Sequence, residues 1–151
     1  VFPPISFFYI VPDTRYPLPT THYPLPMQLV FATNNSHKFK EVRKILPSSV
    51  TLLNLKDIGC YDELPETGNT IKSNAHQKSR YIHEKFGADC FADDTGLEVT
   101  ALNGQPGVYS ARFAGHDSDS SENIKKLLNE MKGVKDRRAM FRTVLAFLVN
   151  F

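Results

Sequence analysis

The stretch "QLVFATNNSHKFKEVRKIL", residues 28–46, predicts a strand, a polar turn and a helix in immediate succession. "QLVFAT" (28–33) is a short apolar run rich in strand-forming residues, which is typical of a buried strand. "NNS" (34–36) is a turn and helix-capping signal. Apolar residues then recur at helical spacing until Pro47 ends the pattern. A strand followed at once by a helix favours an α/β protein.

Strand and helix patterns continue to alternate on the C-terminal side of this stretch. The further predicted elements are strands at 50–55, 89–92, 97–102 and 138–151, a helix from about Thr70 to Phe86 and a helix within 116–133. Gly87 is a typical residue just past a helix end. In the last helix we expect Ile124, Leu127, Leu128 and Met131 to face inward. The predicted fold class is therefore α/β, with a mixed β-sheet flanked by helices.

The composition of the 151 residues limits the classes of partner. Hydrophobic residues make up 41% and charged residues 23%, as in a single globular domain. Eighteen basic and 16 acidic residues are too balanced for attraction to nucleic acid or membranes through bulk charge, so any anion site must be local. The two cysteines lack metal or redox spacing, which favours a reducing, cytoplasmic setting. No apolar run is long enough to span a membrane.

Residues 1–26 differ in amino-acid composition from the rest of the chain. They contain seven of the ten prolines and two charged side chains. We expect a Pro-rich, extended and poorly ordered extension rather than a signal peptide, because an unbroken apolar run behind a basic start is missing. The first methionine is Met27, so we expect the native protein to begin there and the folded domain to cover 27–151.

The turn before the first helix is a candidate anion site. Free N–H groups and a partial positive charge gather at a helix N-terminus. Thr33 and Asn35 can donate further hydrogen bonds. Lys38 lies in the first helical turn, where the helix dipole disfavours a cation unless an anion binds nearby. The alternative is an ordinary capped helix with a solvated lysine, and the Gly-rich loop of P-loop proteins is absent.

A second candidate site is acidic. Asp93-Asp94 end a predicted strand, and Glu66 precedes the second long helix. A few carboxylates completed by water and phosphate are the usual ligands of Mg²⁺. A polar turn is the alternative, although two adjacent charged aspartates repel each other and add nothing to a turn. The tripeptide Asp94-Thr95-Gly96 also occurs in aspartic proteases. Those enzymes need two copies of it and an all-β fold.

Two polar residues of the second helix lie on one face. Asn74 and Lys78 are four positions apart. The structural alternative for Lys78 is a lysine at the edge of the apolar stripe that extends to solvent. The five histidines show no zinc-ligand spacing with the cysteines, and no Ser-His-Asp arrangement stands out.

Four segments together resemble a known family. "LVFATNNSHKFKEVRKIL", "PETGNTIKSNAHQKSRYI", "FADDTGLEVTALNGQPGVYSARFAG" and "DRRAMFRTVLAFL" occur in that order. They are similar to the inosine triphosphate pyrophosphatase family, the house-cleaning dITP/XTP pyrophosphatases, in its bacterial form. The resemblance covers 27–151. It implies an ITPase-like fold and Mg²⁺-dependent hydrolysis of ITP, dITP or XTP, purine nucleoside triphosphates, to monophosphate and pyrophosphate, in a homodimer.

The resemblance also implies roles for particular residues. It places the triphosphate-binding loop on Thr33, Asn34, Asn35, Ser36, His37 and Lys38. It places metal ligands on Glu66, Asp93 and Asp94, and Asp94 is also the expected proton acceptor. Further substrate contacts fall on Asn74, Lys78 and Thr95.

The chain departs from the family pattern in two places. Ser73 stands where the family usually has Glu, which is expected to loosen the helix. The Gly-rich Phe-Gly-Tyr-Asp segment, a later Lys and the Ser-His-Arg segment are absent, so we expect a C-terminally truncated, ITPase-like fragment with weak or no activity. The alternatives are a non-catalytic fragment that binds nucleotide or metal, and a dimeric aspartic protease.

Overall fold

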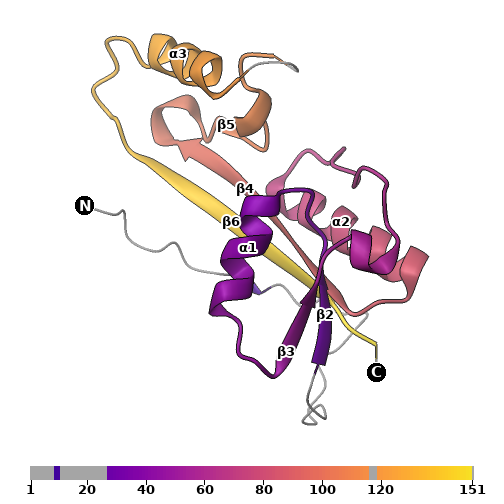
Figure 1. Cartoon of the computed structure of the whole chain (residues 1–151). Helices are drawn as coiled ribbons and strands as arrows, with labels where there is room; N and C mark the ends of the chain where they lie inside the picture. Colours follow the sequence, from indigo (N-terminus) through magenta and orange to yellow (C-terminus); the bar gives the residue numbers. More distant parts are fainter. Residues whose placement is uncertain (1–8, 11–26, 116–118, 151) are drawn as a thin grey trace.

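The computed structural model describes residues 9–10, 27–115 and 119–150 (Figure 1). Its strands are β1 (Tyr9–Ile10), β2 (Met27–Phe31), β3 (Val50–Leu53), β4 (Cys90–Val99), β5 (Pro106–Gly107) and β6 (Ala139–Leu148). Its α-helices are α1 (Ser36–Ile45), α2 (Ile71–Phe86) and α3 (Ser120–Glu130). The strands form one sheet in the order β1-β6-β4-β2-β3, with β5 paired to β4. Parallel and antiparallel pairs coexist, which confirms the mixed sheet.

The predicted strand-turn-helix unit at 28–46 contributes to the apolar cores on both faces of the sheet. Leu29 and Phe31 pack with apolar residues of α1, including Phe39 and Val42. Val30 lies in a separate cluster on the α2 side of the sheet. Because successive strand side chains point to opposite faces, one apolar run supplies both cores. The continuous apolar pattern of this strand is therefore explained by burial on both faces.

Helix α2 has clear signals at both ends. Thr70 caps its N-terminus by accepting a hydrogen bond from the backbone N–H of Ser73. Gly87 follows its C-terminus with φ of 63°, a left-handed conformation that glycine adopts without strain. Along the helix, Ile71 and Ala75 pack against apolar residues of β6. The predicted helix at about 70–86 is confirmed.

Strand β4 corrects the prediction of two separate strands at 89–92 and 97–102. Residues 90–99 form one continuous strand, and all ten pair antiparallel with β6. The polar residues at 93–96 therefore stay extended, because β6 supplies their backbone hydrogen bonds. The turn interpretation of this segment is wrong, and the predicted strand residues 100–102 form a 3-10 helix instead.

Strands β4 and β6 extend beyond α1 and α2 to a second region, which carries β5 and α3 (Figure 1). Helix α3 buries Met131 at its end. Ile124 and Leu128 are 56% and 54% exposed, so the prediction that both face inward is wrong. Helix α3 contacts the short 3-10 helix at 110–112 and does not lie flat on the sheet, which leaves part of its apolar stripe uncovered.

Of residues 1–26, the structure describes only Tyr9–Ile10. These two residues pair in parallel with β6 at the edge of the sheet. The remainder of the predicted Pro-rich extension lies outside the described residues.

Candidate active site

The loop between β2 and α1 is built by side-chain caps. Asn35 Oδ1 accepts hydrogen bonds from the backbone N–H groups of His37 and Lys38, at 3.0 and 3.2 Å. Thr33 Oγ1 accepts from the backbone N–H of Asn35 at 3.1 Å. The Thr33 hydroxyl proton and the Asn35 amide group remain as donors. Asn34 of this loop is exposed, as are Ser36 and His37 in the first turn of α1.

Lys38 turns from this helix start toward the sheet. Its Nζ lies 2.5 Å from Oδ2 of Asp93, a residue that is only 6% exposed. Lys38 is thus paired with a carboxylate, and its side chain is 36% exposed. A buried carboxylate compensates the cation that the helix dipole disfavours at this end.

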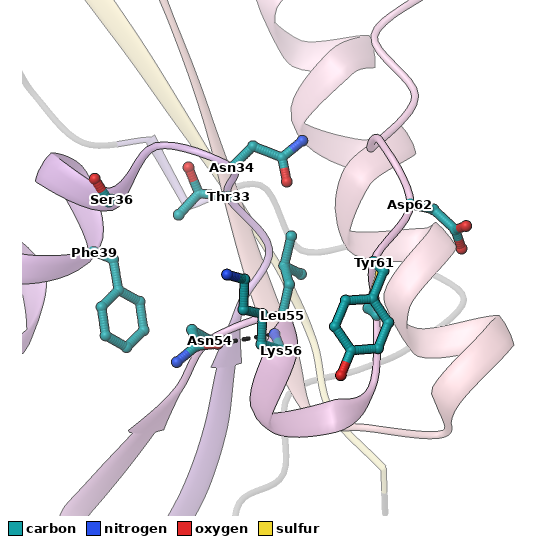
Figure 2. A pocket seen from close by; sticks show the side chains of 10 residues that line it. Thr33, Asn34, Ser36, Phe39, Asn54, Leu55, Lys56, Tyr61 and Asp62 are labelled. Carbon is teal, nitrogen blue, oxygen red and sulfur yellow. Dashed lines mark hydrogen bonds between the residues drawn. The ribbon is translucent and has the colours of Figure 1, made fainter.

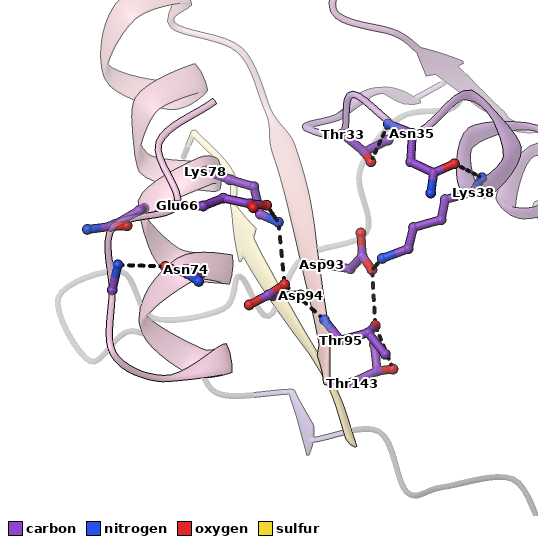
Figure 3. Close-up of polar contacts among 12 residues, drawn as sticks. Thr33, Asn35, Lys38, Glu66, Asn74, Lys78, Asp93, Asp94, Thr95 and Thr143 are labelled. Atoms are coloured by element: carbon purple, nitrogen blue, oxygen red, sulfur yellow. Dashed lines mark hydrogen bonds and ion pairs between the residues drawn. The ribbon is translucent and has the colours of Figure 1, made fainter. Parts of the chain in front are cut away.

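Lys78 of α2 reaches the sheet from the other side (Figure 3). Its Nζ lies 2.5 Å from Oε1 of Glu66 and 3.8 Å from Oδ1 of Asp94. Lys78 is 6% exposed, so the alternative of a lysine that extends to solvent is wrong. One ammonium group thus lies between two carboxylates.

Asp94 is the least satisfied polar residue of this cluster. Its Oδ1 accepts a hydrogen bond from the backbone N–H of Thr95 at 3.0 Å. Its Oδ2 is buried and has no hydrogen-bond partner within the described residues. Burial raises the pKa of Asp94 above its usual range, and the charge of Glu66 adds to this, whereas Lys78, the Thr95 N–H and the Asn74 side chain oppose it. A carboxylate whose proton affinity is raised in this way is suited to accept a proton.

The two aspartates lie on opposite faces of β4. Asp93 points toward Lys38 and the α1 side, and Asp94 toward Lys78 and the α2 side (Figure 3). Strand β2 pairs with β4 only as far as Phe91, and β5 begins to pair at Leu97. Between these points no described strand covers that edge of β4. A ligand at this open edge can therefore contact groups from both faces.

Asn74 supports the loop that carries Glu66. It is 1% exposed, and its Oδ1 accepts the backbone N–H of Gly68 at 2.7 Å. Thr67 is held to α2 by two hydrogen bonds with Gln77, each 3.0 Å long. Ser73 completes the capping box with Thr70, so its replacement of Glu does not loosen the helix start.

The predicted metal ligands are only partly brought together. Glu66 and Asp94 lie around the same ammonium group, whereas Asp93 lies on the other face and pairs with Lys38. Among the described residues, no three His, Cys, Asp or Glu side chains are grouped closely enough to hold a metal ion. The Glu66 and Asp94 carboxylates, which share the Lys78 ammonium group, nevertheless fit a cation with two protein carboxylates, and Mg²⁺ usually takes its other ligands from water and phosphate.

A pocket of about 340 Å³ adjoins the β2–α1 loop (Figure 2). Thr33, Asn34 and Ser36 line one side, and residues 54–56 and 60–62 line the other. The sequence did not predict that residues 54–56 and 60–62 line a pocket, because no motif marks the segment after β3. It also missed Thr143, whose hydroxyl lies 3.0 Å from that of Thr95. Thr143 is the one hydroxyl residue within the apolar strand β6, a signal that needs the strand register before it has meaning.

Comparison with known proteins covers most of the chain. A model of the Ham1 family matches residues 29–150. The dITP/XTP pyrophosphatase of Flavobacterium psychrophilum is 52% identical over 124 residues, which are 82% of this chain and 65% of that protein. The enzyme of the same name from Flavobacterium johnsoniae is 52% identical over 119 residues, covering 79% of this chain and 62% of that protein. This chain thus spans slightly less than two thirds of the length of these relatives.

Solved structures agree with the sequence comparison. The Staphylococcus aureus Ham1 protein aligns with a TM-score of 0.74 at 37% identity, over 82% of this chain and 64% of its own. A nucleoside-triphosphatase, or dITP/XTP pyrophosphatase, from Mycobacterium abscessus aligns with a TM-score of 0.70 at 38% identity, over 82% of this chain and 66% of its own. In the described part of the chain, none of the helices is both long and apolar enough to cross a membrane.

Proposed function

This chain belongs to the Ham1 family, and from that premise we propose that it carries the phosphate-binding and catalytic part of a nucleoside triphosphate pyrophosphatase. The proposed reaction splits ITP, dITP or XTP into the monophosphate and pyrophosphate in a Mg²⁺-dependent manner. The names of the relatives at 52% identity support the choice of substrates. The resemblance to the family supports a homodimer, which light scattering on the purified chain would test.

The observation that carries this proposal is Asp94. It is a half-buried carboxylate with a raised pKa, and its buried Oδ2 has no hydrogen-bond partner in the described structure. It lies at the open edge of β4, on the α2 side, whereas the Lys38 ammonium approaches from the α1 side. We propose that this oxygen accepts the proton of the water that attacks the α-phosphorus.

The remaining residues bind and neutralise the triphosphate. The N–H groups at the start of α1, with the donors of Thr33 and Asn35, suit phosphate oxygens. Lys38 and Lys78 add positive charge on either side of β4. Mg²⁺ held by Asp94 and Glu66 would supply further positive charge against the phosphate oxygens. Asp93 holds Lys38 in place through their ion pair. We propose that Asp93 contributes its charge to the site and does not bind the metal ion together with Asp94.

The test is the product of the reaction. The purified chain is incubated with dITP and Mg²⁺, and pyrophosphate and orthophosphate are measured separately. We expect pyrophosphate at a low rate, in keeping with the weak activity expected of this chain, and we expect Asp94→Asn to lower kcat by roughly 10²–10⁴-fold. The matched control is Asp136→Asn, because Asp136 is an aspartate of the second region that pairs with Arg138, and its loss should leave kcat unchanged.

Two results would contradict the proposal. Release of orthophosphate without pyrophosphate would exclude this reaction class. Binding of dITP by a folded wild-type chain that never turns it over would favour a nucleotide-binding protein without catalysis.

A further inference from the structure

A pair of hydroxyl groups crosses the β4–β6 ladder beside the proposed site. Thr95 and Thr143 are register partners in the antiparallel pair, and their Oγ1 atoms are 3.0 Å apart. Both side chains are half-buried. Directly opposed residues have neighbouring Cβ atoms, so each hydroxyl limits the rotation of the other. We propose that Thr143 is a positioning residue, which orients the Thr95 hydroxyl toward Asp93 and the phosphate loop.

The direction of the hydrogen bonds follows from counting protons. Thr95 Oγ1 also lies 3.5 Å from Oδ2 of Asp93, and an ionised carboxylate can only accept. A hydroxyl has a single proton, so both hydrogen bonds can form together only if Thr143 donates to Thr95 and Thr95 donates to Asp93. In this arrangement Thr143 is the first donor of a chain that ends on the carboxylate paired with Lys38 (Figure 3).

This orientation has a consequence for phosphate binding. With Thr143 donating, the Thr95 proton points to the α1 face of β4, where Lys38 and Asp93 lie. A phosphate oxygen at the open edge can then take that proton in place of the long contact to Asp93. Without Thr143, the Thr95 side chain can rotate, and its proton is shared among several directions. The effect on phosphate binding rests on the proposed function, whereas the effect on the Thr95 rotamer does not.

The first test needs no ligand. Three-bond NMR couplings report the χ1 rotamer of Thr95 in the wild type, Thr143→Val and Thr143→Ser. We expect one rotamer in the wild type and in the serine variant, which keeps a hydroxyl. We expect rotamer averaging in the valine variant, which keeps the branched shape and loses the donor. A single unchanged Thr95 rotamer in Thr143→Val would overturn the inference.

The second test measures affinity for inorganic tripolyphosphate with Mg²⁺ by calorimetry. Thr143→Val should weaken binding about fivefold, as expected for one hydrogen bond, and Thr143→Ser should restore it. In a protein that already carries Thr95→Val, adding Thr143→Val should not change the affinity for tripolyphosphate. Thr51→Val, on the exposed face of β3, is the control and should bind as the wild type does.

The outcomes separate the two proposals. If the wild type does not bind tripolyphosphate, the proposed phosphate site fails, and the rotamer measurement alone decides the role of Thr143. An equal loss of affinity from Thr143→Val with and without the Thr95 hydroxyl would show that Thr143 does not act through Thr95.

Discussion

Asp93 and Asp94 have different environments because a strand turns neighbouring side chains to opposite faces. Asp93 has a lysine at 2.5 Å, and Asp94 has a lysine at 3.8 Å and an oxygen without a partner in the described residues. The charge of Asp93 is thereby compensated, whereas burial favours the neutral form of Asp94.

The raised pKa of Asp94 predicts a pH dependence of stability in the metal-free protein. In the pH window between the ordinary pKa of 3.8 and the raised pKa of Asp94, the folded state keeps the Asp94 proton and the unfolded state has lost it. Within this window the folded state binds more protons than the unfolded state, so the free energy of unfolding falls as the pH rises. Above the window, Asp94→Asn should therefore unfold at a higher temperature than the wild type, as measured by calorimetry in EDTA.

The neighbouring residue supplies the control for this prediction. Asp93→Asn should lower the unfolding temperature under the same conditions, because it removes the carboxylate that compensates Lys38. The difference between Asp94→Asn and the wild type should shrink as the pH falls toward 3.8. Equal destabilisation by both variants at neutral pH would contradict the assignment of different environments.

At the scale of elements, the site depends on the close contact between β4 and β5. A Cβ added to Gly96 would lie 2.3 Å from the backbone oxygen of Gly107 and 2.8 Å from Cδ1 of Ile71. Backbone atoms cannot rotate away as a side chain can. Gly96 therefore lets β5 pair with β4 immediately after the open edge that carries Asp93, Asp94 and Thr95.

Gly96→Ala should destabilise the fold because the added methyl group overpacks this contact. We expect a loss of roughly 1–3 kcal/mol in the free energy of unfolding, measured by urea titration. Activity should fall as well, since the strands must separate next to Asp94. The control is Gly87→Ala, where a Cβ meets no atom within 4 Å and the only cost is the left-handed φ. Equal activity of the two variants would show that the β4–β5 contact does not support the site.

At the scale of the whole molecule, the two halves of the proposed site come from opposite layers. The proposed phosphate-binding residues Thr33 to Lys38 belong to α1 and its preceding loop, whereas Lys78 belongs to α2 and Glu66 to the loop before it. A triphosphate with Mg²⁺ would bind to both layers across the open edge of β4.

This arrangement predicts that the complete ligand stabilises the fold. At a hundredfold excess over Kd, bound dITP and Mg²⁺ should add about 2.7 kcal/mol to the free energy of unfolding. For a chain of this size the unfolding temperature should rise by roughly 5–10 °C, which differential scanning fluorimetry can measure. EDTA should reduce the shift. Lys38→Met should also reduce it, whereas Lys125→Met, on the exposed side of α3, should not. A full shift in EDTA would contradict the metal proposal.

Several features of this protein follow from local sequence. The strand-turn-helix unit at 28–46 and the limits of α2 were predictable, because apolar spacing, caps and Gly87 act within a few residues. The presence of a mixed sheet with flanking helices followed from the alternation of these patterns. Lys38 against the helix dipole predicted a bound anion nearby, and in the structure the Asp93 carboxylate lies next to Lys38.

Other features depended on contacts between distant segments. The polar residues 93–96 form part of a strand only because β6, more than 40 positions away at Thr143, pairs with them. The register of this pairing sets Thr143 beside Thr95, and the extended backbone turns Asp93 away from Asp94. Local propensity predicted a turn, since it contains no information about a partner strand. Local patterns thus specified most of the elements and the chemical groups of the site. The face of β4 on which each group acts was set by pairing between β4 and β6, because strand pairing is a long-range interaction.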